Sequence, residues 1–581
     1  MKKGWKIAIA IIAVLLVISG GVAFWLMDKE EITVAKSDHW KFDGKTASES
    51  WGGNGFFGAM NGYGSVAQNV VLSDSAMSFA PTGNLGFSVG GAKDVENFRE
   101  NIEEGYFPIS TDITYNGLFY DYSFDTGVGQ ETDQLFSPAY STAISKDPVS
   151  EKEEYYMTVG LNSNIKASDF ARKKLNLVVV LDISGSMSSG MAEYYYDNPL
   201  KQTEYKSKME VANESVNILL DQLNDDDRFG MVLFDDEAYV GQEIYSIAST
   251  DVKKLKDHIL EIKDSGGTNF EAGYKLANKL FEEYKNADSD EYENRIIVIT
   301  DAMPNTGSTD KDSLLGMVKE NSENGIYTTF IGVGVDFNTK LIETISDNKG
   351  ANYYSVHTAE DFKTRMGEEF DFMVTPMVFD LKLDLSSEDY EIEKVYGSDT
   401  ANEEKGNIMH VNTLFPSKTN EDGEVKGGVV LLKLRKKSEN TSGEIKLTVS
   451  YTDRNGASYE NYQTVEFADG EERYDNTGIR KAIVLTRYVN TLKNWILYER
   501  AEDEKFLIIP AIGICDCDYT QEEVVVILGE WERKSVKLTV SDEYKVIFEA
   551  LKTYIKEQNN YMKDKTFDKE FEVLDMLIET K

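Results

Sequence analysis

An aspartate and two serines, each two residues apart, form the pattern in this 581-residue chain that most clearly indicates chemistry. Asp182, Ser184 and Ser186 lie at and just beyond the end of the apolar run LNLVVVLDIS, which has the length of a strand buried on both faces. Residues two apart in an extended turn point to the same side, and Gly185 lets the backbone turn sharply there. One carboxylate and two hydroxyls are therefore expected to converge on a point beyond the strand.

Two further oxygen donors follow later in the chain. Thr268 lies in the loop SGGTNF just before an expected helix, and Asp301 comes directly after the apolar run RIIVIT. Ligands of open parallel sheets sit at the carboxyl ends of the strands, where these side chains would meet. Carboxylate and hydroxyl oxygens suit a hard cation that keeps part of its water, which indicates Mg²⁺, with Mn²⁺ and Ca²⁺ as alternatives.

The elements that must position these residues alternate between apolar runs and helical patterns from residue 173 to residue 374. Strands are expected at 175–184, 227–236, 295–300, 327–335 and 351–357. Helices are expected at 206–223, 252–262, 269–285, 313–323, 339–346 and 359–373. This alternation predicts an α/β fold with a doubly wound, mostly parallel sheet that carries helices on both faces.

The five oxygen donors, in this order, resemble the metal-ion-dependent adhesion site (MIDAS) of von Willebrand factor type A (VWFA) domains. The resemblance implies that Asp182, the two serines and Thr268 approach the metal. It also implies that Asp301 ligates the metal directly or through water. The family usually has glycine after that last aspartate, where this chain has Ala302.

Segments outside this domain resemble the bacterial YfbK-like VWFA family. They are VENFRENIEEGYFP and ITYNGLFYDYSF before the domain, and MVTPMVFDLKLDL and VVLLKLRKK after it. The resemblance covers roughly residues 80–500 and is strongest over 175–373. It implies a divalent-metal-dependent module that binds proteins.

Three further regions flank the α/β domain. Residues 28–172 are rich in Gly, Ser, Asn and Tyr and are expected to be mixed and mostly β, with one helix at 95–105. Residues 375–472 alternate with a period of two, which predicts an antiparallel β domain and favours a sandwich. Residues 473–581 are expected to be mainly helical, because 478–501 and about 541–579 show helical patterns.

The N-terminus carries a membrane signal. Residues 7–27 contain no charged side chain and are long enough to span the bilayer, which predicts a transmembrane anchor. Lysines precede this stretch and acids follow it, so residues 1–6 are expected in the cytoplasm and the body outside the cell membrane. The alternative is a signal peptide cleaved near Gly21-Val22-Ala23, which would give a secreted protein.

The composition excludes several classes of function. The 61 Lys and Arg against 101 Asp and Glu give a net charge of −40, which argues against a nucleic-acid partner. The two cysteines, Cys515 and Cys517, exclude a disulfide scaffold and are interpreted as structural thiols. The spacing of Ser, His, Asp and Cys residues shows no catalytic set, so no enzyme is expected.

A bound cation suggests what kind of partner the site would take. Such a cation keeps an open coordination position, which an Asp or Glu of a protein partner can fill. Tyr194, Tyr195 and Tyr196 lie in the segment 188–206 directly after the motif, so they are predicted to contact that partner at the rim. The alternative is that they pack on the loops of their own domain.

The favoured interpretation is thus a membrane-anchored, cell-surface protein that binds a protein partner through a MIDAS. One alternative is a structural scaffold of an envelope complex, in which the metal only adds stability. The other is a metal-dependent hydrolase, which would need a general base near Asp182 that the sequence does not supply.

Overall fold

The computed structural model describes the chain in separate ranges. They are 35–44, 84–89, 91–92, 95–129, 135–148, 151–166, 170–197, 206–284, 291–346, 348–358, 367, 369–398, 402–417, 423–438, 444–454, 456–467, 470–503 and 531–581. Among these residues no helix is both long and apolar enough to cross a membrane. The predicted anchor at 7–27 lies outside the described residues, as do Cys515 and Cys517.

A seven-stranded sheet forms the α/β domain, with strand order β2-β12-β11-β10-β7-β8-β9. Its strands are β2 (Gly91–Ala92), β7 (Lys174–Asp182), β8 (Arg228–Phe234), β9 (Ala238–Ser246), β10 (Tyr292–Thr300), β11 (Ile326–Val333) and β12 (Asn352–Val356). All neighbours are parallel except β8 and β9, which confirms the predicted doubly wound, mostly parallel sheet. The antiparallel edge strand β9 was not predicted.

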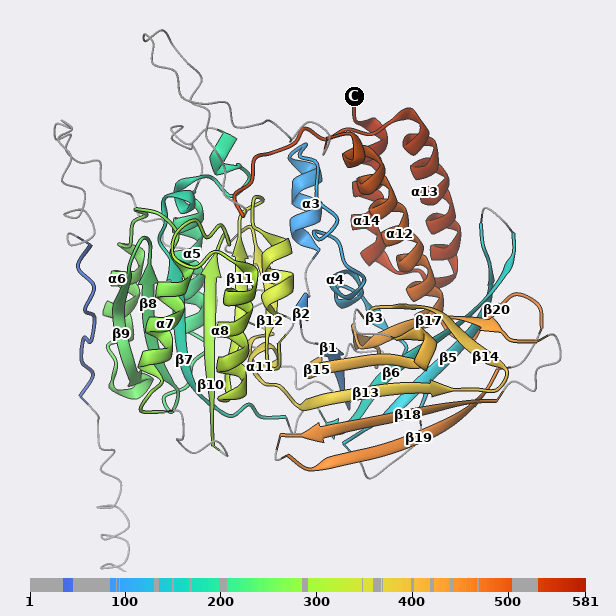
Figure 1. The fold of residues 1–581 in the computed structure, drawn as a ribbon, viewed down its shortest axis with the longest axis horizontal. Helices are drawn as coiled ribbons and strands as arrows, with labels where there is room; N and C mark the ends of the chain where they lie inside the picture. Colours follow the sequence, from blue (N-terminus) through green and yellow to red (C-terminus); the bar gives the residue numbers. More distant parts are fainter. Residues whose placement is uncertain are drawn as a thin grey trace, which may run out of the picture.

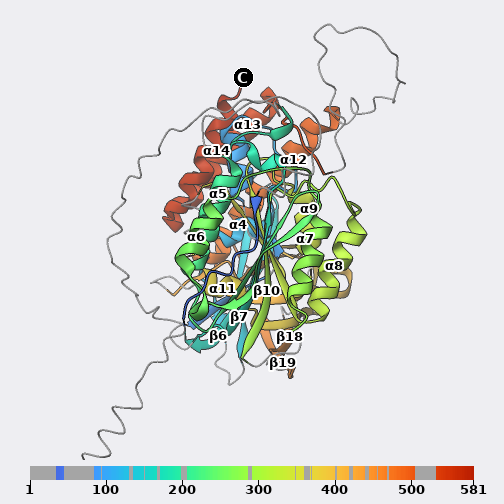
Figure 2. The ribbon, with the colours of Figure 1, turned by 90° about the vertical axis from the view of Figure 1, so that its left-hand side faces the viewer.

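Helices cover both faces of this sheet, as Figure 2 shows with α5 and α6 on one side and α7, α8 and α9 on the other. Their bounds are α5 (Lys208–Leu220), α6 (Val252–Leu260), α7 (Phe270–Leu280), α8 (Lys311–Glu323), α9 (Thr339–Ser346) and, beyond them, α11 (Phe370–Val374). Strand β7 contributes side chains to the apolar cores on both faces of the sheet. Val179 packs toward α5 and α6, whereas Val178 and Val180 pack toward α7 and α8. Because β7 is buried on both faces of the sheet, its sequence is a continuous apolar run.

The second sheet is antiparallel and has eleven strands, eight of which follow the order β14-β17-β6-β1-β15-β13-β18-β19. These are β1 (Asn84–Val89), β6 (Glu153–Lys166), β13 (Val378–Ser386), β14 (Tyr390–Tyr396), β15 (Asn407–Ser417), β17 (Val429–Lys436), β18 (Glu444–Asp453) and β19 (Ser458–Glu466). β5 (Phe136–Lys146) pairs with β6, β4 (Val128–Gly129) and β20 (Arg473–Tyr474). A separate pair joins β3 (Ser123–Phe124) and β16 (Val425–Lys426).

Strands from both flanks of the α/β domain share this antiparallel sheet. β1 and β6 precede the domain in sequence, and they pair with β15 and β17, which follow it. The alternating burial along β13 confirms the period-two pattern of that segment. The α/β domain is therefore inserted between two parts of one sheet (Figure 1).

Helices α12 (Thr477–Asp503), α13 (Asp542–Met562) and α14 (Asp568–Glu579) confirm the predicted helical C-terminal region. Figure 1 shows them side by side above the antiparallel sheet. They share one apolar core with α3 (Glu96–Glu103), α4 (Tyr115–Tyr120) and sheet residues such as Leu431. Helices α13 and α14 thus complete an apolar core that they share with residues preceding the α/β domain.

A capping box fixes the start of α5. The Ser207 side chain accepts a hydrogen bond from the Glu210 backbone N–H, and the Glu210 carboxylate accepts one from the Ser207 backbone N–H. We expect Ser207→Ala to lower the free energy of unfolding by about 1 kcal/mol, measured by urea denaturation, because one N-terminal N–H loses its acceptor. Ser207→Asp keeps an acceptor and is the control; an equal loss in both variants would contradict this role of the serine oxygen.

Candidate metal centre

The aspartate and serine side chains of the first motif converge at the carboxyl end of β7. Asp182 Oδ1 accepts a hydrogen bond of 2.9 Å from the Ser184 backbone N–H, and Oδ2 accepts one of 2.6 Å from Thr300 Oγ1. The Oγ atoms of Ser184 and Ser186 lie 3.0 Å apart. All three predicted side chains are buried, so the turn holds one carboxylate and two hydroxyls together as the spacing predicts.

The loop that contains Thr268 is hydrogen-bonded to the turn that follows β7. The Gly185 N–H donates to the Gly266 carbonyl at 3.0 Å, and the Ser265 N–H donates to the Ile183 carbonyl at 2.6 Å. These two hydrogen bonds fasten the loop before Thr268 to the turn after β7. Thr268 itself is buried.

Asp301 follows β10 and is fully buried. Its Oδ2 lies 3.1 Å from Lys208 Nζ, whereas its Oδ1 is buried and accepts no hydrogen bond of ordinary geometry. The next residue, Ala302, has a φ of 56°. Glycine adopts this left-handed conformation most easily, so Ala302 holds it at a higher cost than glycine would.

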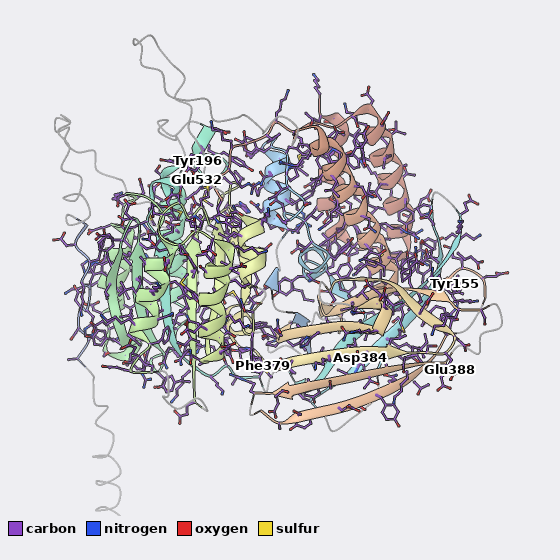
Figure 3. All side chains as sticks on the ribbon, viewed as in Figure 1. Tyr155, Tyr196, Phe379, Asp384, Glu388 and Glu532 are labelled. Atoms are coloured by element: carbon purple, nitrogen blue, oxygen red, sulfur yellow. The ribbon has the colours of Figure 1, made fainter. Side chains whose placement is uncertain are left out.

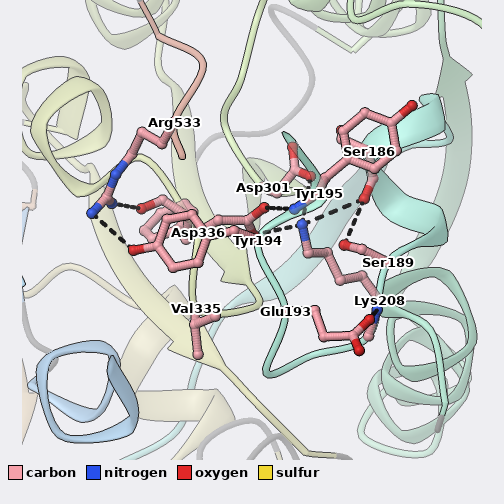
Figure 4. A network of polar contacts seen from close by, with 12 residues as sticks. Ser186, Ser189, Glu193, Tyr194, Tyr195, Lys208, Asp301, Val335, Asp336 and Arg533 are labelled. Carbon is pink, nitrogen blue, oxygen red and sulfur yellow. Dashed lines mark hydrogen bonds and ion pairs between the residues drawn. The ribbon is translucent and has the colours of Figure 1, made fainter. Parts of the chain in front are cut away.

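Two charged residues that the sequence analysis missed complete the centre. Lys208 lies in the first turn of α5, and its Nζ contacts Asp336 Oδ1 at 2.5 Å and the Ser186 carbonyl at 3.4 Å (Figure 4). Both side chains are 0% exposed. A lysine at a helix N-terminus opposes the helix dipole, and here the two buried carboxylates offset that cost. Asp336 lies just beyond the end of β11, as Asp301 does beyond β10.

The charges of this cluster do not balance. With the carboxylates of Asp182, Asp301 and Asp336 ionised, one ammonium group of Lys208 leaves a net charge of −2. Burial, and after it the charge of Asp301, raises the pKa of Asp182. Burial also raises the pKa of Asp301, although Lys208 opposes this shift. Burial alone would lower the pKa of Lys208, but Asp336 and Asp301 raise it above its usual value.

The donor set fits a divalent cation. A charge of +2 would neutralise the cluster when all three carboxylates are ionised, and Asp301 Oδ1 is buried without a hydrogen bond of ordinary geometry. The two serine hydroxyls lie 3.0 Å apart. The described ranges contain no group of three or more His, Cys, Asp or Glu placed to hold a metal, so a cation here would also need hydroxyl oxygens. Such an oxygen set suits Mg²⁺, Mn²⁺ or Ca²⁺.

The three tyrosines have different environments, and the expectation for Tyr194 is wrong. Tyr194 is 4% exposed, and its Oη donates to Asn101 Oδ1 at 2.7 Å, so it packs within the molecule. Tyr195 and Tyr196 are half-buried. The Tyr195 N–H donates to Asp336 Oδ2 at 3.1 Å, and Tyr196 Oη donates to Glu532.

Comparisons with known proteins concern mainly the α/β domain. Residues 177–304 match the family model of the von Willebrand factor type A domain. The chain is 25% identical over 229 residues to the uncharacterized protein YfbK of Escherichia coli (strain K12), over 38% of this chain and 36% of that protein. It is 22% identical over 206 residues to inter-alpha-trypsin inhibitor heavy chain H2 of Sus scrofa, over 35% of this chain and 20% of the heavy chain.

The chain therefore spans about a fifth to about a third of the length of these curated relatives. Among solved structures, von Willebrand factor type A from Catenulispora acidiphila aligns with a TM-score of 0.38 and 14% identity. That alignment covers 65% of this chain and 90% of the other chain.

Proposed function

We propose that this chain, which carries a von Willebrand factor type A domain at residues 177–304, binds a protein partner through a divalent cation at the carboxyl edge of its parallel sheet. The observation that carries the proposal is the buried cluster of three aspartates and one lysine beside two convergent hydroxyls. Its Asp301 Oδ1 is buried without a hydrogen-bond partner. A cation supplies the charge and the bonds that this cluster lacks.

The residues of the centre have different roles in holding the proposed metal. Asp182, Ser184, Ser186 and Thr268 would hold the metal, and Asp301 would approach it directly or through water. Mg²⁺ is the proposed ion, with Mn²⁺ and Ca²⁺ as alternatives. The bound metal would supply an open coordination position, which an Asp or Glu side chain of the partner fills.

The binding of metal is tested by calorimetric titration of Mg²⁺ and Mn²⁺ into the full chain after treatment with chelator. We expect one-to-one binding that weakens at least 100-fold in Asp182→Ala, because the buried carboxylate is the first ligand. Asp257→Ala, on the exposed face of α6, is the matched control and should bind as the wild type does. Unchanged binding in Asp182→Ala would place the metal elsewhere and overturn the proposal.

Thr268→Ala separates a binding role from a purely stabilising one. We expect the affinity for Mg²⁺ to fall about ten-fold. The melting temperature in chelator should stay within about 2 °C of the wild type, because the removed hydroxyl serves the cation. A large drop in melting temperature without a change in Mg²⁺ affinity would show that the Thr268 side chain stabilises the fold and does not hold the cation.

The uncharged stretch at residues 7–27 supports a further part of the proposal, namely a membrane anchor with the body of the chain outside the cell. The test is alkaline extraction of membranes, followed by protease treatment of intact cells. Retention in the membrane together with cleavage from outside is expected. Release into the alkaline supernatant would contradict the anchor.

A further inference from the structure

A segment from the C-terminal region crosses the rim of the candidate metal centre. We call residues 531–538, with the sequence WERKSVKL, the strap. Figure 1 shows it in red, running between the top of the α/β domain and the C-terminal helices. Its contacts reach three loops that follow the ends of parallel strands, so it lies on the face where a partner of the cation would arrive.

Trp531 anchors the start of the strap. Its side chain is 3% exposed and packs in the apolar core that contains Leu314 and Leu341. Its Nε1 donates to the Thr309 carbonyl at 2.6 Å, and its carbonyl accepts from Asn338 Nδ2 at 2.7 Å. A buried aromatic side chain whose N–H is hydrogen-bonded is a strong anchor for an extended segment, and the bond to the Trp531 backbone carbonyl adds to it.

Glu532 places a carboxylate beside the metal centre. It accepts hydrogen bonds from Tyr196 Oη and, at 3.1 Å, from Asn305 Nδ2. Asn305 Oδ1 in turn accepts from the Thr268 backbone N–H at 2.8 Å, so one side chain separates Glu532 from a residue of the centre. Figure 3 shows Tyr196 and Glu532 together at the top of the α/β domain.

Arg533 and the following backbone hold the far end of the strap. Arg533 Nη1 donates to the Phe337 carbonyl at 2.8 Å, and Nη2 donates to Tyr194 Oη at 3.3 Å (Figure 4). The Ser535 N–H donates to Asp197 Oδ1 at 3.0 Å. Beyond the rim, the Leu538 N–H donates to the Gly105 carbonyl at 2.8 Å.

We propose that the strap is an internal ligand of the partner-binding rim. The surface beneath it then fits an extended partner segment that carries an aromatic side chain, a carboxylate and a guanidinium group in that order. The carboxylate of such a partner would meet the like charge of Glu532, so the strap must leave before the partner binds. The inference rests on the proposed function for the role of the cation, whereas the contacts of the strap with the rim do not need the cation.

The experiment adds the strap to the protein as a separate molecule. A fluorescently labelled peptide, WERKSVKL, is titrated with the full chain, with and without Mg²⁺, and its anisotropy is measured. Because a tethered segment has a high effective concentration, the wild type should bind the peptide poorly. We expect binding at least ten-fold tighter in Glu532→Ala and in Trp531→Ala/Glu532→Ala. The matched control Glu543→Ala, which removes an acid at the start of α13, should behave as the wild type does.

A second peptide, with glutamine in place of glutamate, separates this inference from the proposed function. We expect it to bind the variants about ten-fold more weakly than the first peptide, and this difference should grow when Mg²⁺ is added. Tighter binding in the variants without any effect of Mg²⁺ would support the strap and contradict the cation. Equal peptide binding by wild type and variants, within two-fold, would overturn the internal ligand.

Hydrogen exchange of backbone amides tests the seating of the strap without the double variant, which could fail to fold. In Glu532→Ala without metal, the Ser535 amide should exchange at least ten-fold faster than in the wild type, because its contact with Asp197 depends on the seated strap. The Leu538 amide, bonded to Gly105 outside the rim, should change little. An unchanged Ser535 amide would show that Glu532 does not hold the strap in place.

Discussion

Replacing Lys208 by methionine is expected to lower the free energy of unfolding by about 3–5 kcal/mol when chelator is present. The ammonium group lies 2.5 Å from Asp336 and 3.1 Å from Asp301, and all three side chains are fully buried. Methionine keeps most of the length of the side chain but leaves the two carboxylates without their buried cation. Urea denaturation of the full chain measures the loss.

Saturating Mg²⁺ should return a substantial part of this loss, because a cation that binds the folded state stabilises it by mass action. The recovery should be larger in Lys208→Met than in the wild type, since the variant has the greater excess of negative charge. Lys206→Met is the matched control: Lys206 is 60% exposed and pairs with Glu214, so its loss should cost less than about 1 kcal/mol. Equal stabilities of Lys208→Met with and without Mg²⁺ would contradict a cation beside Asp301.

The parallel sheet could be predicted because burial on both faces leaves a simple sequence signal. In β7, residues on both sides of the strand are apolar, and the same holds for β10. The edge strand β9 gave no such signal, because several of its residues are half-buried and one is exposed. A partly buried edge strand needs few apolar residues, so its pairing with β8 was visible only in the structure.

The pairing of the antiparallel sheet could not be predicted from local pattern. Val159 of β6 lies opposite Val430 of β17, and the whole α/β domain separates them in sequence. Alternation within a strand shows which face is buried, but it does not show which distant strand is its neighbour. The regions before and after the domain were therefore expected as separate units, although they share one sheet.

The metal centre could be predicted only where its residues are close together in the sequence. Asp182, Ser184 and Ser186 lie within one turn, so their convergence follows from local backbone geometry. The contact between Lys208 and Asp336 and the contact between Glu532 and Tyr196 join distant segments. Spacing along the chain carries no information about such contacts, which depend on how the loops and the strap pack.

Replacing Arg99 by methionine is the second change expected to have a large effect. Arg99 lies in α3 and forms ion pairs with Glu96, Asp121 and the buried carboxylate of Glu570 in α14. Its loss should lower the free energy of unfolding by about 3–5 kcal/mol, because Glu570 then keeps a buried charge without the guanidinium group. Denaturation followed by fluorescence measures this effect.

The comparison of Arg99 with Lys208 isolates the contribution of the metal. Lys569→Met is the control for Arg99: Lys569 is 49% exposed and pairs with the same Glu96, so its loss should cost less than about 1 kcal/mol. Mg²⁺ should raise the stability of Arg99→Met by no more than it raises that of the wild type, because Arg99 makes its ion pairs in the helical region. Selective rescue of Arg99→Met would mean that Mg²⁺ acts on the fold as a whole, whereas selective rescue of Lys208→Met locates the cation at the end of β7.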